Sequence, residues 1–169
     1  MKRFGILACA IAMTLTCPAR AEDFTHEIEQ AKGLTAKDGR AVKESDIDSL
    51  KHISTLEEQK GKYVDECGKS VTPKIAALNL GEKLKGTRAI IVQDGACYAP
   101  EENSITVLDG NDRILWQDNA TSIAVLSSKN QAVNDLAFAM GGATRSVWRW
   151  SGDTHAYEHV ENIEVSPEK

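Results

Sequence analysis

The 169-residue sequence has no long apolar run after its first 17 residues and has little basic charge. A membrane-spanning helix needs about 20 consecutive apolar residues, so we do not expect a membrane-embedded protein. Lys and Arg together number 20, against 25 Asp and Glu. Because contact with phosphates needs a basic surface, we also expect no nucleic-acid partner.

The start of the chain carries the pattern of an export signal. Met1–Arg3 is positively charged, Phe4–Cys17 is apolar, and Ala19–Ala21 matches the small residues that precede a cleavage site. We therefore expect residues 1–21 to be a signal peptide and the protein to be periplasmic, with secretion beyond the outer membrane left open. Removing 21 residues leaves 148, with 17 basic and 25 acidic residues and a formal charge of −8.

Cysteine is rare in the expected mature chain, where only Cys67 and Cys97 remain. Two cysteines allow one pairing, and an oxidising compartment favours a disulfide. The bridge would close a loop of 31 residues, and loss of chain entropy in the unfolded state would then stabilise the fold by about 3–4 kcal/mol. A reactive thiol is the alternative, although neither cysteine belongs to a Cys-x-x-Cys pair.

Hydrophobic periodicity divides the chain into a helical first third and a strand-rich remainder. Phe24, Ile28 and Ala31 recur at helical spacing, and a second helix is predicted from Ser45 to about Gly61. The apolar stripe of that second helix consists of Ile47, Leu50, Ile53 and Leu56. After Pro73 the pattern predicts short strands over residues 74–80, 87–93, 104–108, 113–117, 122–127, 134–140, 145–150 and 155–160. Turn residues predict hairpins at Asp109–Asp112 and Ser151–Thr154.

These elements predict an α+β fold, with an N-terminal helix or helices packed on a mainly antiparallel sheet or sandwich of about seven to eight short strands. Residues 22–44 are expected to form a partly helical arm, and residues 45–160 a single α+β domain. Residues 161–169 are expected to form a frayed tail.

The last predicted hairpin concentrates aromatic residues in a chain that has few of them. Alternation places Ser146, Trp148 and Trp150 on one face. A turn centred on Gly152–Asp153 would set Trp150 opposite His155, Trp148 opposite Tyr157 and Ser146 opposite His159. Trp148, Trp150 and Tyr157 then form either part of the core or a platform for a glycan or another small ligand. The opposite face, with Arg145 and Arg149 near Glu158, is expected to be a solvated ion-pair surface.

Two stretches of the sequence carry a resemblance. Gly141–Ala143 followed by Val147-Trp148-Arg149-Trp150-Ser151-Gly152 and Tyr157 resembles the closing hairpin of small exported proteobacterial β-rich domains of unassigned activity. Tyr63-Val64-x-x-Cys67-Gly68-x-x-Val71-x-Pro73 is similar to the start of the sheet region in these domains. The resemblance covers about residues 63–160 and implies a β-rich fold and an exported location, but no catalytic residues.

Known catalytic motifs are absent from the sequence. There is no G-x-S-x-G, H-E-x-x-H, phosphate loop or dinucleotide fingerprint, so we predict no catalytic residues and no cofactor. His155 and His159 with Asp153 could bind a metal ion, but residues four apart on a strand lie roughly 13 Å from each other. We therefore predict no metal site.

Small size, export, one disulfide and net acidity favour a noncatalytic binding protein of the bacterial envelope. An inhibitor or immunity protein against a basic cell-wall hydrolase or toxin is the first hypothesis, because an acidic surface attracts a basic partner. Tyr98, Glu101 and Glu102, in the loop next to Cys97, are its candidate contact residues. A small-ligand or glycan-binding module that uses Trp148, Trp150 and Tyr157 is the second hypothesis. An unrecognised periplasmic hydrolase is the third.

Overall fold

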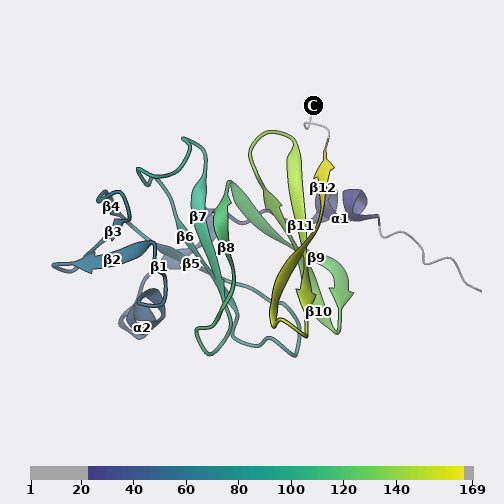
Figure 1. The fold of residues 1–169 in the computed structure, drawn as a ribbon, viewed down its shortest axis with the longest axis horizontal. Coiled ribbons are helices and arrows are strands. Elements are labelled where there is room, and N and C mark those ends of the chain that lie inside the picture. The colour runs from purple at the N-terminus through teal and green to yellow at the C-terminus, as the bar shows by residue number, and fades with distance from the viewer. Residues whose placement is uncertain (1–22, 166–169) are drawn as a thin grey trace, which may run out of the picture.

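Residues 23–165 are described by a computed structural model (Figure 1), so the expected signal peptide lies outside the described residues. Within residues 23–165 the chain forms twelve strands in three antiparallel sheets and two short α-helices. The prediction of an α+β fold with packed N-terminal helices is therefore wrong. The protein is a mainly β structure, because the region from residue 40 to residue 71 contributes four further strands that the sequence pattern did not predict.

The N-terminal part contains short elements. They are α1 (Phe24–Gln30), the 3-10 turns η1 (Ala36–Asp38) and η2 (Glu44–Asp46), β1 (Arg40–Ala41) and α2 (Ile47–Leu50). A small sheet in the order β2-β3-β4 follows, with bounds Leu56–Gln59, Lys62–Asp65 and Ser70–Val71.

Two larger sheets follow. The five-stranded sheet has the order β1-β5-β6-β7-β8, with β5 (Lys74–Ala77), β6 (Arg88–Val92), β7 (Asn103–Leu108) and β8 (Ile114–Ala120). The four-stranded sheet has the order β12-β11-β10-β9, with β9 (Ser122–Asn130), β10 (Val133–Ala139), β11 (Thr144–Ser151) and β12 (Ala156–Glu164). Each of the eight strands predicted after Pro73 overlaps one of β5–β12, and the Asp109–Asp112 hairpin is confirmed between β7 and β8.

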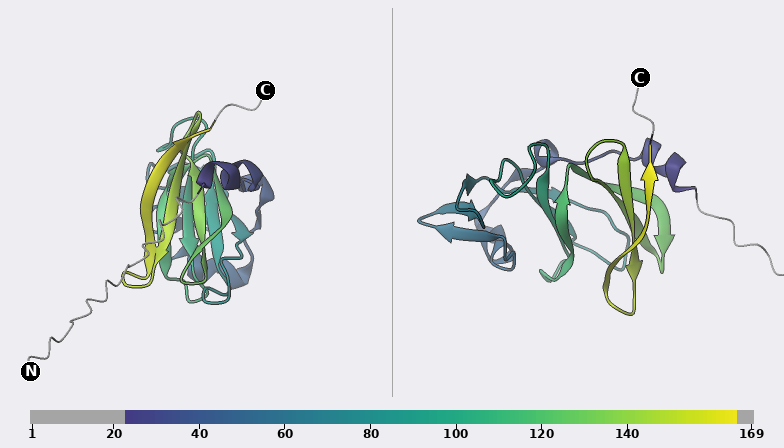
Figure 2. Two further views of the ribbon diagram at one scale, coloured as in Figure 1. Left: turned by 90° about the vertical axis from the view of Figure 1, so that its right-hand side faces the viewer. Right: turned by 45° about the horizontal axis from the view of Figure 1, so that its top comes forward.

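The two larger sheets pack face to face around the main core. Ile91 and Val107 of the five-stranded sheet belong to one cluster with Leu136 and Phe138 of the four-stranded sheet. The Trp116 ring of β8 stacks on Phe138, with 3.6 Å between ring centroids. Figures 1 and 2 show the resulting layers: α2 with the small sheet, then the five-stranded sheet, then the four-stranded sheet, then α1. The β6 and β7 strands are almost wholly buried because their sheet is covered on both faces.

The predicted helix from Ser45 to Gly61 is wrong beyond its first turn. Only Ile47–Leu50 is α-helical, and Leu56–Gln59 pairs with β3 through a hairpin that turns at Lys60 and Gly61. Both turn residues have positive φ, 53° and 77°, as a type I′ hairpin turn requires. Leu50 and Ile53 nevertheless pack on the outer face of the five-stranded sheet, with Leu56 beside them. Three of the four predicted stripe residues therefore lie on the buried side, but α2, the turn after it and β2 carry one each, and Ile47 is not part of this cluster.

The register predicted for the last hairpin is also wrong. Ser151 pairs with Ala156, so the loop contains the four residues Gly152–His155, and Trp150 lies opposite Tyr157. A bulge between Val147 and Trp148 then sets Trp148 opposite His159 and Ser146 opposite Asn162. A two-residue loop is the commonest hairpin connection, but four-residue loops also occur, and sequence alternation does not distinguish them.

The opposite face of this hairpin is not the solvated ion-pair surface that was expected. Arg149 forms an ion pair with Asp135, which is fully buried, at 2.6 Å between Nη2 and Oδ2. The Phe24 ring of α1 lies 5.5 Å from the Arg149 guanidinium carbon, so α1 covers this part of the sheet. Residues 161–164, expected as part of a frayed tail, continue β12.

Candidate binding loop at the disulfide

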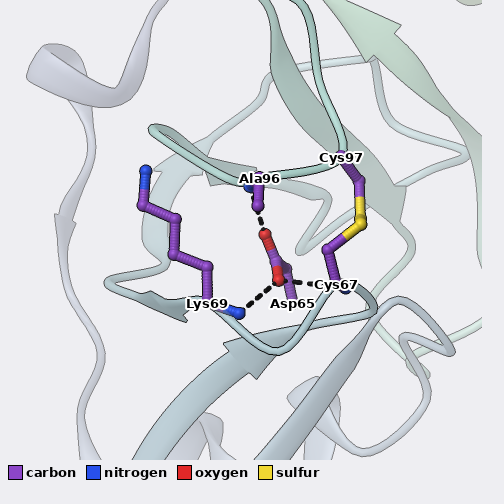
Figure 3. The surroundings of a disulfide bond; sticks show 5 residues. All are labelled: Asp65, Cys67, Lys69, Ala96 and Cys97. Atoms are coloured by element: carbon purple, nitrogen blue, oxygen red, sulfur yellow. Dashed lines mark hydrogen bonds between the residues drawn. A yellow bond between two sulfur atoms is a disulfide. The ribbon is translucent and has the colours of Figure 1, made fainter.

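The Cys67–Cys97 disulfide is present, as the sequence predicted, and it joins two parts of the chain that are far apart in sequence. Cys67 lies in the turn between β3 and β4, and Cys97 lies in the connection from β6 to β7, here called loop 93–102. The two Cα atoms are 5.8 Å apart. The bridge therefore fastens loop 93–102 of the five-stranded sheet to the small sheet (Figure 3).

A buried carboxylate makes a second connection at the same place. One oxygen of Asp65, Oδ2, accepts a hydrogen bond from the Ala96 backbone N–H at 2.6 Å. The other, Oδ1, accepts the backbone N–H groups of Cys67 and Lys69 at 3.1 and 2.8 Å. In Figure 3 the Asp65 side chain lies between the β3–β4 turn and the loop. Loop 93–102 is thus held by one covalent and one hydrogen-bonded link.

The environment of Asp65 favours its charged form. Burial alone raises the pKa of this carboxyl group, but the three backbone N–H groups outweigh burial and hold the pKa below its ordinary value. Charge-assisted hydrogen bonds of this kind are stronger than neutral ones. The link between Asp65 and Ala96 should therefore persist at neutral pH.

Tyr98 folds back onto its own loop. A Cβ atom at Gly95 would overlap the Tyr98 ring, so this close approach requires glycine. Burial raises the pKa of the Tyr98 phenol, and the nearby Asp65 and Glu66 carboxylates raise it further. Tyr98, predicted as a contact residue, is half-buried and stiffens the loop by packing within it.

The two predicted glutamates differ in their surroundings. Glu101 is exposed, whereas Glu102 is half-buried and its carboxylate accepts the Ala99 backbone N–H at 3.4 Å. The Glu102 N–H in turn donates to the Ala99 carbonyl at 2.9 Å, which closes a tight turn. The structure therefore brings Tyr98, Glu101 and Glu102 into one loop, with Glu101 the most available to a partner.

The end of loop 93–102 is anchored to a different part of the five-stranded sheet. Asn103 is buried, and its side-chain amide donates to the backbone carbonyls of Ala120 and Thr121. Glu101, Glu102 and Lys37 line a shallow hollow of about 200 Å³ beside this anchor. The loop is therefore fixed at Ala96 and Cys97, and the chain is anchored again at Asn103, the first residue of β7.

The surface around the loop carries more acidic than basic groups. Glu66, Asp94 and Glu101 are exposed here, with Glu102 half-buried beside them. The basic residues nearby are Lys37, Lys69 and Lys74. The loop therefore presents a rigid, locally acidic surface, which is suited to contact with a basic protein surface.

The aromatic residues proposed as a second site lie mainly in the core. Trp150 and Tyr157 are each 5% exposed and belong to the cluster between the two larger sheets. The Tyr157 hydroxyl donates to the Asn134 carbonyl at 2.7 Å, and burial raises the pKa of this phenol. Trp148 is partly buried, with its indole N–H on the Ser146 hydroxyl. These contacts favour packing over ring stacking with a ligand.

Residues 23–165 contain no group of three or more His, Cys, Asp or Glu side chains that could hold a metal ion. The His155 ring lies against Trp150, and His159 lies against Trp148 with a nitrogen 3.0 Å from the Asn162 amide oxygen. No helix in this part of the chain is long and apolar enough to cross a membrane.

Asp65, which holds the loop through a hydrogen bond, was not predicted from the sequence. Its local signal was present, because Asp often accepts backbone N–H groups a few residues further along a turn. Its bond to Ala96 spans 31 positions and has no local signal.

Comparison with protein-family models, curated proteins and solved structures finds no match to this chain.

Proposed function

We propose that this chain is an exported, noncatalytic binding protein of the bacterial envelope that holds a basic protein partner on the surface around loop 93–102. The expected partner is a cell-wall hydrolase or a toxin. The observation that carries the proposal is the double attachment of the loop, by the disulfide and by the bond from Ala96 to Asp65. A loop that is ordered before binding loses little conformational entropy when a partner docks.

Charge supports the choice of a basic partner. Asp94 and Glu101 are exposed on the loop, and Glu66 is exposed beside its disulfide anchor. The expected mature chain is also acidic overall, with a formal charge of −8. Complementary charge raises the rate of encounter, and salt screens this effect. Binding should therefore weaken as the salt concentration rises.

The first experiment is an affinity capture from envelope extract, with the oxidised protein as bait, at low and then at moderate salt. Mass spectrometry identifies the proteins that elute. We expect a basic hydrolase or toxin that binds at low salt and is released as salt rises. Failure to capture a basic protein at either salt concentration would contradict the proposal.

The second experiment places the captured partner on the loop. The double variant Asp94→Asn with Glu101→Gln removes two exposed charges and should lower the association rate at low salt by about tenfold. Glu161→Gln is the matched control, because Glu161 is an exposed acid on β12 of the other large sheet. Equal association rates for the double variant and the wild type would place the partner elsewhere.

A further inference from the structure

A larger cavity lies on the other side of the molecule, between α1 and the outer face of the four-stranded sheet. Its volume is about 650 Å³, within the range of about 300–1,000 Å³ that is usual for small-molecule sites. Ile28 and Ala31 of the α1 region cover it, Ala143 and Val165 close one end, and the sheet forms its floor. Figure 2 shows α1 lying across this end of the sheet.

The cavity exists because small side chains occupy the floor. Strand register places Ala137 of β10 opposite Ala124 of β9, and Ala139 in the next row opposite Ser122. At the other end of α1 the same face carries Leu126 and Val147, and Phe24 is buried against them. The helix therefore packs on large side chains at Phe24, whereas Ile28 and Ala31 lie over a row of small side chains.

One cationic group faces this apolar space. Arg145 of β11 lies opposite Ala139 and lines the cavity. Its Nη1 donates to the backbone carbonyls of Gly142 and Thr144, both at 3.0 Å. Among residues 23–165, its Nε and Nη2 groups have no hydrogen-bonding partner, and no carboxylate lies within salt-bridge distance. The guanidinium is therefore oriented by the backbone and keeps donors available.

We propose that this cavity binds an aliphatic carboxylate, a free medium-chain fatty acid, with its carboxylate on Arg145 and its hydrocarbon chain over the alanines. An apolar chain matches the Ala124, Ala137 and Ala139 floor, because burying methylene groups there removes apolar surface from water. A carboxylate matches the geometry of the available guanidinium donors. This site is separate from loop 93–102, and neither proposal depends on the other.

Glu29 provides an internal check on the orientation of the ligand. It is exposed in the last turn of α1 and also lines the cavity, so its negative charge opposes a bound carboxylate. Glu29→Gln should therefore tighten binding of the fatty acid, by about twofold, because the charge is solvent-screened. Arg145→Gln should have the opposite effect.

The test is calorimetric titration of sodium decanoate into the protein expressed from the full-length chain. We expect saturable binding at one site, weakened at least about tenfold by Arg145→Gln, which removes a charge-assisted hydrogen bond. Decanol, which lacks the carboxylate, should bind more weakly than decanoate to the wild type and equally to wild type and Arg145→Gln. Arg113→Gln is the matched control, because Arg113 is exposed at the β7–β8 hairpin.

A second variant tests the location of the hydrocarbon chain. Ala124→Leu places a larger side chain on the partly exposed floor and should abolish both decanoate and decanol binding. Circular dichroism and thermal unfolding confirm that the variant is folded. Absence of saturable binding to the wild type would overturn the proposal. So would binding that is unchanged in Arg145→Gln, or in a folded Ala124→Leu variant.

Discussion

The two large sheets are covered on their outer faces by layers that are attached in very different ways. The layer on the five-stranded sheet, formed by α2 and the small sheet, is joined by the disulfide, by Asp65 and by the Arg40–Asp46 ion pair. Arg88 of β6 adds a hydrogen bond to Ser49 of α2. Among residues 23–165, the layer on the four-stranded sheet is formed by α1.

Fewer contacts hold α1. Phe24 is buried against Leu126 and Val147, and the Glu27 carboxylate accepts the Ser128 backbone N–H at 2.7 Å. Dense cross-links thus accompany a filled interface and a rigid loop, whereas the lightly attached α1 leaves a cavity beneath it. The two proposed sites correspond to these two outcomes.

Removing the disulfide should have the largest effect. We expect the double variant Cys67→Ser with Cys97→Ser to lose about 3–4 kcal/mol of unfolding free energy, because the unfolded chain regains loop entropy. Urea unfolding measures the loss, and limited proteolysis should show new cleavage in loop 93–102. A variant as stable as the oxidised wild type would mean that Asp65 and packing alone hold this layer.

Breaking the buried Arg149–Asp135 ion pair beneath α1 should have the second-largest effect on stability. Asp135→Ala leaves the partly buried Arg149 without this carboxylate and should cost about 3 kcal/mol. Asp118→Ala is the control, because Asp118 is exposed on β8, and it should change stability by no more than about 0.5 kcal/mol. Similar losses for the two variants would show that Asp135 does not anchor the β10–β11 pair.

Truncating the Phe24 side chain should show that the two outer layers open independently. Phe24→Ala removes the main apolar contact of α1 and should lower the free energy of local opening of this helix by about 2 kcal/mol. Hydrogen exchange should then accelerate in α1 while α2 stays protected. Equal acceleration in both helices would mean that the layers open together.

Lowering the pH should destabilise the layer formed by α2 and the small sheet, because Asp46 becomes protonated. The Arg40 guanidinium and the Lys43 backbone N–H lower the pKa of Asp46 from 3.8 to about 2, against the opposing effect of burial. A pKa depressed in the folded state contributes stability above the unfolded value, and this contribution is lost as pH falls from about 4 through about 2. Asp46→Asn should be less stable at neutral pH, and its deficit should shrink over that window. A deficit independent of pH would contradict this assignment.

An exposed pair in the same layer should contribute least. Lys51 and Asp48 are 2.6 Å apart, but their side chains are 64% and 87% exposed. Asp48→Ala should therefore leave the free energy of unfolding unchanged within the error of the measurement. A larger loss in thermal unfolding would show that this short helix needs the pair.

The elements predicted correctly from the sequence are those whose signal lies within a few neighbouring residues. Strands after residue 74 were predicted correctly, because alternation and turn residues lie within each hairpin. The helix from Ser45 was wrong because Ile53 and Leu56 satisfy helical spacing although a turn and a strand carry them. The predicted register of the last hairpin is wrong by two positions at Trp148 and Trp150. Alternation of side chains reveals neither the length of the loop nor the bulge at Val147.

The candidate loop was partly predictable. Cys67 and Cys97 could only pair with each other in the expected mature chain, and Glu101 was expected to be near that bridge. The bond from Ala96 to Asp65 could not be expected, since its partners lie 31 positions apart. Burial of Trp150 and Tyr157 also depends on Trp116 and Phe138, which belong to other strands of the sandwich.

The sequence by itself determined the disulfide partners, the strands from residue 74 onward and the acidic balance, because each depends on composition or on neighbouring residues. Only the tertiary structure decided that both sheets are covered on their outer faces, that Asp65 holds the loop, and that a cavity remains under α1. These features depend on which surfaces meet. Periodicity marks the side of an element that is buried, but it does not specify what packs there.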